Sequence, residues 1–164
     1  MKNLSDLPSK IPVFPLPGVL LLPRTRLPLN IFEPRYLAMF DDALKTDHRL
    51  IGMVQPRENP NGKKDDCLQQ IGCAGRITSF SETEDGRYLI TLSGISRFRV
   101  TQTNQGFEPY LNADVSWSSF KSDLGKKELD EQFDRPQFLS ILSRFFKASS
   151  LSTDWDSMKD ADEE

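Results

Sequence analysis

The sequence predicts a mainly β fold of the α+β class, namely a small, partly open β-barrel with one inserted helix at about residues 34–47. Two observations predict the barrel: short apolar runs with β alternation recur between residues 11 and 117, and turns rich in glycine and proline separate them. A third observation is that this alternation is lost near residue 120, where a helical pattern follows. We therefore expect three parts: an N-terminal tail (1–10), a β domain (11–118) and a helical appendage (119–164) that starts a C-terminal helical bundle.

The composition is typical of a globular protein and argues against some functions. Hydrophobic residues make up 37% of the 164 residues and charged residues 27%, so a core can form. The net charge of −3 disfavours a general nucleic-acid-binding protein, whose binding surface is basic. The start, "MKNLSDLPSK", lacks the apolar stretch of an export signal, and four prolines interrupt the most apolar run, 11–23. We predict a cytoplasmic protein with reduced thiols and no membrane segment.

Two strand regions precede the helix. Residues 11–22 are expected to form a strand, a turn and a second strand, because Pro17-Gly18 suits the central positions of a type II turn. Residues 26–32 alternate apolar and other side chains, which indicates a further strand. Pro28 has no N–H for a hydrogen-bond ladder, so this strand is expected at a sheet edge or at a bulge.

The helix at 34–47 has the clearest periodicity in the first half of the chain. Its expected apolar stripe consists of Leu37, Phe40 and Leu44, with Tyr36 and Ala43 beside it. Pro34 fits the first helical position, where a missing N–H costs nothing. Glu33 places a negative charge at the positive end of the helix dipole.

The remaining strands of the barrel are expected at 50–57, 68–82, 88–100 and 111–117. A polar loop at 58–66 and a turn at 104–110 separate some of them. The sequence "EDGR" at 84–87 predicts a type I′ hairpin turn, because Asp-Gly tolerates positive φ. Two glycines are expected to bend the strand at 68–82.

The appendage contains one strong helix pattern that starts at Pro136. Its apolar positions are Phe138, Leu142, Phe145 and Phe146, and further apolar residues make the helix apolar around most of its circumference. Such a helix is normally buried between partners. We therefore expect that the sequence stops within a longer bundle or that another chain covers this face.

No catalytic, cofactor-binding or metal site is predicted. His48 is the only histidine, and Cys67 with Cys73 cannot complete a four-ligand zinc set. The phosphate-binding pattern G-x-x-x-x-G-K-[ST] and the nucleophile pattern G-x-S-x-G do not occur. His48 is expected near a helix end or in solvent, and the two cysteines as a loop thiol and a small strand residue.

Basic and aromatic residues meet on the predicted strand at 88–100. Arg97 and Arg99 flank Phe98 on the opposite face of the strand, and this combination could contact RNA. An ordinary outer sheet face is the preferred interpretation, because RNA binding needs a basic surface that the composition does not show.

Several blocks of the chain resemble the N-terminal domain of Lon-type ATP-dependent proteases. The stretch 11–44 is similar to the family pattern P-V-F-P-L, then P-L-x-I-F-E-P-R-Y, then a helix; the matching residues are Pro12 to Leu16, Pro28, Leu29 and Ile31 to Tyr36. A second block, 71–100, resembles I-G-x-x-x-x-I, D-G-R and G-x-x-R-F-R; the matching residues are Ile71, Gly72, Ile77, Asp85 to Arg87, Gly94 and Arg97 to Arg99. With 108–115, the resemblance covers about residues 11–117.

The resemblance implies a PUA-like pseudo-barrel followed by a helical bundle. In Lon proteases this region recognises and holds substrate polypeptide, and the ATPase and Ser-Lys peptidase modules lie downstream, with no counterpart in these 164 residues. The chain thus looks like a stand-alone bacterial Lon-domain protein, a non-catalytic module that binds unfolded or extended polypeptide, such as an adaptor in proteolysis. A protease or a second copy of the chain is a further expected partner. No nucleic acid, membrane, metal or cofactor is expected.

The stretch "NIFEPRY" at 30–36 supplies the candidate contacts for polypeptide: Glu33, Arg35 and Tyr36. Helix-start signals explain most of this segment, and Glu33 and Arg35 are the residues that packing needs least. Two alternatives remain. One is a structural or assembly domain that docks a partner through Phe138, Leu142, Phe145 and Phe146; the other, a small hydrolase, rests only on the family name and on the NIFEPRY side chains.

Overall fold

The computed structural model describes residues 4–57, 68–125 and 134–160. The chain divides into two compact units, Met1–Lys126 and Lys127–Glu164. The first unit contains η1 (Leu4–Asp6), β1 (Lys10–Pro15), β2 (Arg26–Ile31), α1 (Pro34–Leu44), β3 (Leu50–Pro56), β4 (Leu68–Glu82), β5 (Tyr88–Asn104), β6 (Leu111–Ser116) and η2 (Ser118–Leu124). The second contains α2 (Arg135–Ala148) and α3 (Trp155–Asp160).

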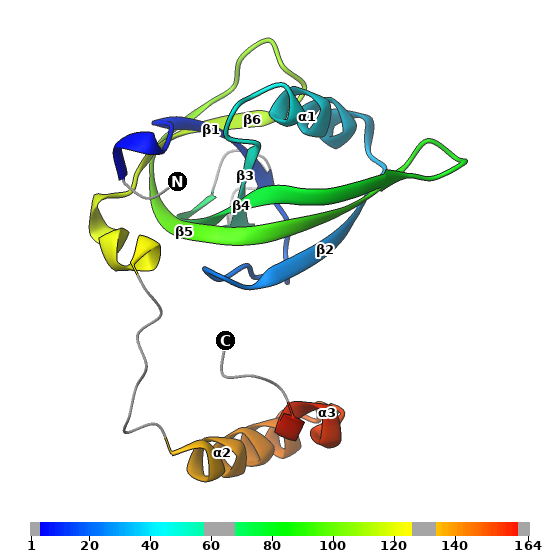
Figure 1. The fold of residues 1–164 in the computed structure, drawn as a ribbon, viewed down its shortest axis with the longest axis vertical. Helices are drawn as coiled ribbons and strands as arrows, with labels where there is room; N and C mark the ends of the chain where they lie inside the picture. Colours follow the sequence, from blue (N-terminus) through cyan, green and yellow to red (C-terminus); the bar gives the residue numbers. More distant parts are fainter. Residues whose placement is uncertain (1–3, 58–67, 126–133, 161–164) are drawn as a thin grey trace. The chain divides into compact units, whose positions relative to one another are not determined.

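Five strands of the first unit close into a ring. The strand order is β2-β5-β4-β3-β1-β6, and a further pairing between β5 and β6 completes the circuit, with β2 left outside at the edge of β5. β1 pairs with β3 in parallel, with β2 and α1 between them in the chain, and the other pairs are antiparallel. The predicted mainly β fold with a partly open barrel and one inserted helix is confirmed (Figure 1).

Strand β5 belongs to two substructures. Its first part, 88–93, lies between β2 and the end of β4, whereas 99–104 pairs with β6 in the ring. The end of the β4–β5 hairpin and β2 therefore form a three-stranded extension of the ring (Figure 1). We call this extension the wing; it consists of Arg26–Ile31, 77–82 and 88–93.

Helix α1 begins as the sequence predicts. Pro34 is at the first helical position, and the Glu33 carbonyl oxygen accepts hydrogen bonds from the N–H groups of Tyr36 and Leu37, each at 2.9 Å. The Glu33 side chain makes no capping hydrogen bond, so its contribution at the helix start is limited to its charge.

The predicted apolar stripe of this helix is partly wrong. The buried residues of α1 are Tyr36, Met39, Phe40 and Ala43, while Leu37 and Leu44 are only half-buried. Aromatic contacts explain the difference, because the Tyr36 ring packs on Phe14 at 4.1 Å and the Phe40 ring on Tyr88 at 4.8 Å. These partners come from β1 and β5, so they orient the helix in a way that local periodicity does not show.

A second cluster of buried residues fills the ring around Phe98, which is fully buried. Its ring packs edge-on against Trp117 at 5.7 Å. Glycine at position 72 makes room for it, since a Cβ there would lie 2.5 Å from the tip of the Phe98 ring. Arg97 and Arg99 alternate with the buried Phe98 along β5 and are half-exposed. Both side chains therefore lie on the outer face of the ring, as predicted.

The second strand predicted within 11–22 does not form. Gly18 has a φ of 76° and provides a turn after β1, but no strand follows until β2. Instead, the Gln55 side chain accepts a hydrogen bond from the Gly18 N–H at 3.1 Å and donates one to the Val19 carbonyl. Pro23 and the positive φ of Arg24 (70°) then end any extended run before β2.

The hairpin at 84–87 is present, but its predicted type I′ geometry is wrong. Gly86 alone has a positive φ, 76°, whereas type I′ needs two such residues. The Gly86 N–H donates to the Thr83 carbonyl and the Thr83 N–H to the Arg87 carbonyl, each at 2.9 Å. These bonds describe a three-residue loop that ends in a glycine bulge.

Both ends of the β domain contact the ring. Leu7 is buried in the cluster around Phe98, and the Trp117 indole N–H donates to the Pro8 carbonyl at 2.9 Å. At the other end, the backbone N–H of Arg97 in β5 donates to the Asp123 carboxylate of η2 at 2.9 Å. The division into a tail, a β domain and an appendage at residues 10 and 118 stays a prediction.

The second unit confirms the helix predicted from Pro136. The Asp134 side chain caps it by accepting a hydrogen bond from the Gln137 N–H at 2.9 Å. α3 follows, and its Trp155 ring contacts Phe146 edge-on at 5.6 Å. A larger helical bundle stays a prediction. The predicted loop at 58–66 and the loop thiol Cys67 lie outside the described residues, so they stay predictions too.

Candidate functional site

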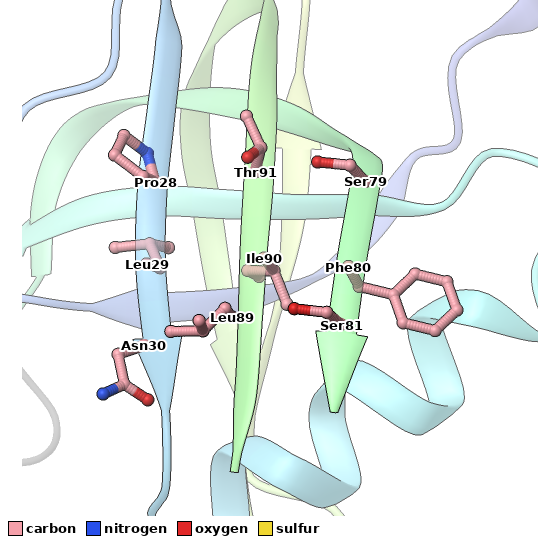
Figure 2. Close-up of a pocket in the computed structure, with 9 residues that line it drawn as sticks. All are labelled: Pro28, Leu29, Asn30, Ser79, Phe80, Ser81, Leu89, Ile90 and Thr91. Atoms are coloured by element: carbon pink, nitrogen blue, oxygen red, sulfur yellow. The ribbon is translucent and has the colours of Figure 1, made fainter. Parts of the chain in front are cut away.

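The outward face of the wing holds a hollow. Its volume is about 580 Å³, and it lies over the middle of β2, the start of β5 and the end of β4 (Figure 2). Its lining consists of Pro28, Leu29, Asn30, Ser79, Phe80, Ser81, Leu89, Ile90 and Thr91. No charged side chain is among these residues, and Leu89 (48% exposed) provides an apolar centre between small hydroxyl groups.

The register of the wing explains this composition. Pro28 pairs with Thr91 and Asn30 with Leu89 across β2 and β5, and Ser81 pairs with Leu89 across β4 and β5. Because side chains alternate between the two faces of a sheet, these residues share one face. The opposite face carries Ile90 and Leu92, which are buried in the core cluster that also contains the buried residues of α1.

β2 has an open backbone edge. Within the described ranges, β2 pairs with no strand on the side away from β5. The Gly94 N–H donates to the Thr25 carbonyl at 2.9 Å, so odd-numbered residues of this strand direct their backbone groups toward β5. Arg26, Pro28 and Asn30 therefore direct theirs outward, and the predicted edge position of Pro28 is confirmed.

The side chains along β2 alternate in exposure. Arg26, Pro28 and Asn30 are exposed, whereas Leu27 and Leu29 are half-buried on the opposite face, where they pack against the core. Two leucines thus remain partly open to water at the edge of the core. Neighbouring strands of a sheet lie about 4.8 Å apart, so the side chains of a strand added at this edge would be close enough to cover both leucines.

The charges near this edge are unequal. Arg26 stands at the start of β2 and has no ion-pair partner in the part of the chain that the structure describes. At the other end, Arg87 pairs with Asp85 at 2.7 Å and lies over the exposed ring of Phe32, 5.9 Å from its centre. The Arg26 end of this edge therefore carries a cation without a counterion among the described residues.

The predicted contacts Glu33, Arg35 and Tyr36 lie directly beyond the other end of β2. The Arg35 guanidinium pairs with the Glu33 carboxylate at 2.9 Å, and both side chains are about half-exposed. Arg35 also lies over the Tyr36 ring, 4.8 Å from its centre. Tyr36 is only 7% exposed, so its ring is mainly a core residue and the ion pair is the accessible part.

The second unit presents an exposed apolar stripe. Phe138, Ile141 and Phe145 are 46%, 57% and 57% exposed and follow one side of α2 at spacings of three and four. Leu142 and Phe146 are half-buried, the latter against Trp155. The predicted docking residues therefore divide between an open side and a side that α3 partly covers.

Cys73 is a free strand cysteine as predicted, and its burial raises the pKa of the thiol to about 12, which disfavours the reactive thiolate. No group of three or more potential metal ligands occurs in the ranges that the structure describes. In the same ranges, no helix is long and apolar enough to cross a membrane.

Comparisons with known proteins agree with this fold. The sequence profile of the ATP-dependent protease La (LON) substrate-binding domain matches residues 10–162. The chain is 32% identical to Lon protease 2 of Myxococcus xanthus over 116 residues, 69% of the chain and 14% of that protein. It is 28% identical to Lon protease 2 of Sorangium cellulosum over 111 residues, 65% of the chain and 13% of that protein.

Two solved structures share the architecture. The Lon N-terminal domain protein from Xanthomonas campestris has a TM-score of 0.57 and 26% identity, and the match covers 84% of this chain and 73% of that one. The N-terminal domain of the Mycobacterium avium complex Lon protease has a TM-score of 0.56 at 14% identity and covers 86% of this chain and 69% of that one, which supports the fold alone.

The ring with its wing is thus the β domain of a Lon-type substrate-binding region. The chain belongs to the ATP-dependent protease La (LON) substrate-binding domain family. It spans between 13% and 18% of the length of the first three full-length relatives that it matches.

Sequence reasoning found the edge strand but missed the hollow beside it. Pro28 indicated an edge, and the alternation of Tyr88, Ile90 and Leu92 could have placed Leu89 on the outward face. The pairing of Ser81 with Leu89 depends on the bulge in β4 between Ile77 and Ser79, which has no sequence signal that we recognised.

Proposed function

We propose that this chain is a non-catalytic module that binds unfolded or extended polypeptide in the cytoplasm, as an adaptor in proteolysis. The observation that carries the proposal is the wing: an uncharged hollow lies beside an unpaired strand edge in a chain of the Lon substrate-binding family. Nucleic acid, metal and cofactors have no part in it.

The wing offers what an extended chain needs. An open strand edge can hydrogen-bond to the backbone of any sequence, and adjacent apolar surface accepts alternate side chains. Leu89, Leu27 and Leu29 provide that surface on the two faces of the wing. Glu33 and Arg35 lie where such a chain would leave β2, so both remain candidate contacts. The Tyr36 ring packs against the Arg35 guanidinium.

Fluorescence anisotropy tests this function directly. A labelled, reduced and carboxymethylated protein that cannot refold is titrated with the chain, and the same protein in its native, disulfide-bonded form serves as the control. We expect saturable binding of the unfolded form only. Equal binding of both forms contradicts the proposal. So does the lack of a saturable signal up to about 100 μM of the chain, a concentration that would detect even weak binding.

The absence of catalysis is tested separately. Incubation with the unfolded protein, with and without ATP, should leave that protein intact on a gel. Turnover that disappears in the Glu33→Ala variant would instead support the hydrolase alternative.

A docking function is the second candidate, and the exposed stripe of α2 favours it. Apolar side chains in a continuous row on a helix are typical of an interface. Sedimentation velocity of the wild type and of a Phe138→Ser, Phe145→Ser double variant tests self-docking. A concentration-dependent dimer that the variant loses supports it, and a monomer in both cases contradicts it.

A further inference from the structure

We infer that β2 is the strand that binds the polypeptide, and that it takes an extended segment antiparallel to itself with a carboxylate near the segment's C-terminal end. This inference rests on the proposed function and names the surface, the direction and the preferred chemistry of the ligand. Three independent features of the β2 edge support it: its backbone groups, its side chains and its charge.

The backbone of β2 provides the first argument. The bond from Gly94 to Thr25 sets the alternation, so Arg26 and Asn30 each direct an N–H and a carbonyl away from β5, and Pro28 directs a carbonyl only. Residues with outward-directed backbone groups recur at every second position, about 6.6 Å apart along the strand. Only another extended backbone matches this spacing with both donors and acceptors.

Pro28 also limits the pairing. Because it has no N–H, one carbonyl of the bound segment finds no donor at the centre of the edge. The strongest backbone bonds therefore form at Arg26 and Asn30, on either side of Pro28. A segment that spans both needs about six residues, since these two positions are roughly 13 Å apart at 3.3 Å per residue.

The side chains of β2 provide the second argument. Leu27 and Leu29 lie on the core-facing side of this edge strand and are half-buried, so part of each side chain is open to water. A bound strand would place alternate side chains beside these leucines, where apolar residues remove further apolar surface from water. The intervening side chains would lie beside Pro28 and Asn30, next to the uncharged hollow.

Charge provides the third argument and the direction. Arg26 is exposed and has no ion-pair partner among the described residues, whereas the other open edge of the wing, at the end of β4, carries Glu82. A carboxylate on the ligand is therefore favoured at β2 and disfavoured at β4. Antiparallel pairing is slightly more stable than parallel pairing, and it places the ligand's C-terminal end beside Arg26.

Synthetic peptides test the inference without changing the protein. The reference peptide is an amidated, fluorescein-labelled octamer that alternates valine and serine and has aspartate as its last but one residue. Two further peptides carry one backbone N-methyl group, on neighbouring central residues. We expect one of these to bind at least about tenfold more weakly and the other to match the reference, because alternate N–H groups face β2.

Charge variants test the direction. Arg26→Gln should weaken the aspartate octamer about three- to tenfold and leave an asparagine octamer unchanged, whereas Lys10→Gln, an exposed cation at the start of β1, changes neither. Moving the aspartate to the second residue of the octamer should abolish its advantage. An equal advantage at both ends contradicts the antiparallel direction.

The outcomes separate this inference from the proposed function. If the unfolded protein binds but both methylated octamers bind like the reference, polypeptide binding stands and the β2 edge is overturned. If neither unfolded protein nor octamer binds, both fall. Sedimentation velocity separates two further outcomes. If the chain forms a dimer that dissociates when the octamer is added, a second copy competes with the octamer for the β2 edge. If the dimer instead excludes the octamer, the second copy is the occupant and the inference is overturned.

Discussion

The Asp123 carboxylate accepts three hydrogen bonds from Arg97: from its backbone N–H at 2.9 Å, from Nε at 2.9 Å and from Nη2 at 2.7 Å. The Asp123 side chain is 7% exposed, and the Arg97 guanidinium also lies over the ring of Phe120, 4.7 Å from its centre. Arg24 adds a bond from Nη2 to the Gly125 carbonyl at 3.1 Å. Two arginines thus fasten η2 to the ring at the place where the chain leaves the first unit.

Asp123→Asn should destabilise the first unit by about 2 kcal/mol, because charge-assisted hydrogen bonds in a mostly buried site are among the strongest polar contacts. Urea unfolding followed by tryptophan fluorescence, with Trp117 as a reporter, measures the loss. The matched control is Asp85→Asn, which breaks the exposed pair with Arg87 and should cost less than about 0.5 kcal/mol. Equal losses in the two variants would refute the special role of Asp123.

The same contact predicts an acid dependence. The hydrogen bonds from Arg97 hold the pKa of Asp123 below its usual value, so the folded state binds a proton there less readily than the unfolded state. Its stabilising contribution is therefore complete above the unfolded pKa of about 4 and is lost as the pH falls through the lowered folded value. The difference in unfolding free energy between wild type and Asp123→Asn should be constant from pH 5 to 8 and shrink below about pH 4.

Tyr110 and Asp42 join the end of the loop before β6 to helix α1. The Tyr110 hydroxyl donates to Oδ2 of Asp42 at 2.9 Å, and burial followed by this hydrogen bond raises the pKa of the tyrosine. Tyr110→Phe should cost about 1 kcal/mol, the usual value of one part-buried hydrogen bond. Thermal unfolding checks it, with Asp41→Asn on the neighbouring exposed position as a control that should be neutral; a Tyr110→Phe melt identical to wild type would contradict the prediction.

Gly94 allows the segment before β2 to approach β5. A Cβ at this position would lie 1.9 Å from the Leu22 carbonyl oxygen, a backbone atom that cannot rotate away. Gly94→Ala should therefore cost about 3 kcal/mol or more, at the upper end of overpacking effects. Gly18→Ala is the contrasting variant, because nothing lies within 4 Å and only the positive φ is strained, at about 1 kcal/mol. The reverse order in chemical unfolding would show that the close approach is absent.

Cys73 should be protected from alkylation in the folded protein. Burial raises its pKa to about 12 from an ordinary value of 9.0, so the thiolate at pH 8 is about a thousandfold rarer than in an exposed cysteine. Iodoacetamide labelling followed by mass spectrometry measures the rate in a Cys67→Ser background, so that one thiol is observed. Labelling at the same rate in buffer and in 8 M urea would contradict the buried position.

The sequence predicted the features of the fold that depend on local chemistry. Pro28 indicated an edge because a missing N–H acts on its own strand, and Pro34 indicated the helix start for the same local reason. The rotation of α1 toward Met39 was not predictable, because it depends on aromatic contacts with β1 and β5 that are distant in the chain. Tertiary packing therefore outweighed periodicity at Leu37 and Leu44.

The candidate site was predictable only in part for a related reason. The side chains of the hollow come from three strands, and they meet only when the register between β4 and β5 is known. That register contains two shifts, between Ala74 and Gly75 and between Ile77 and Ser79. The candidate contacts Glu33 and Arg35 were recognisable as spare polar residues, but their mutual pairing required the geometry of the turn between β2 and α1.

The pairing of β1 with β6 has a consequence for the protein during its synthesis. β1 is the first strand to leave the ribosome, yet one of its two neighbours, β6, is the last strand of the ring. Until Leu111–Ser116 has emerged, the nascent chain holds an incomplete ring whose β1 and β5 edges are both unpaired on the side that β6 will occupy. Such open edges invite pairing with other chains, so a ribosome that stalls before β6 leaves the most aggregation-prone form of this protein.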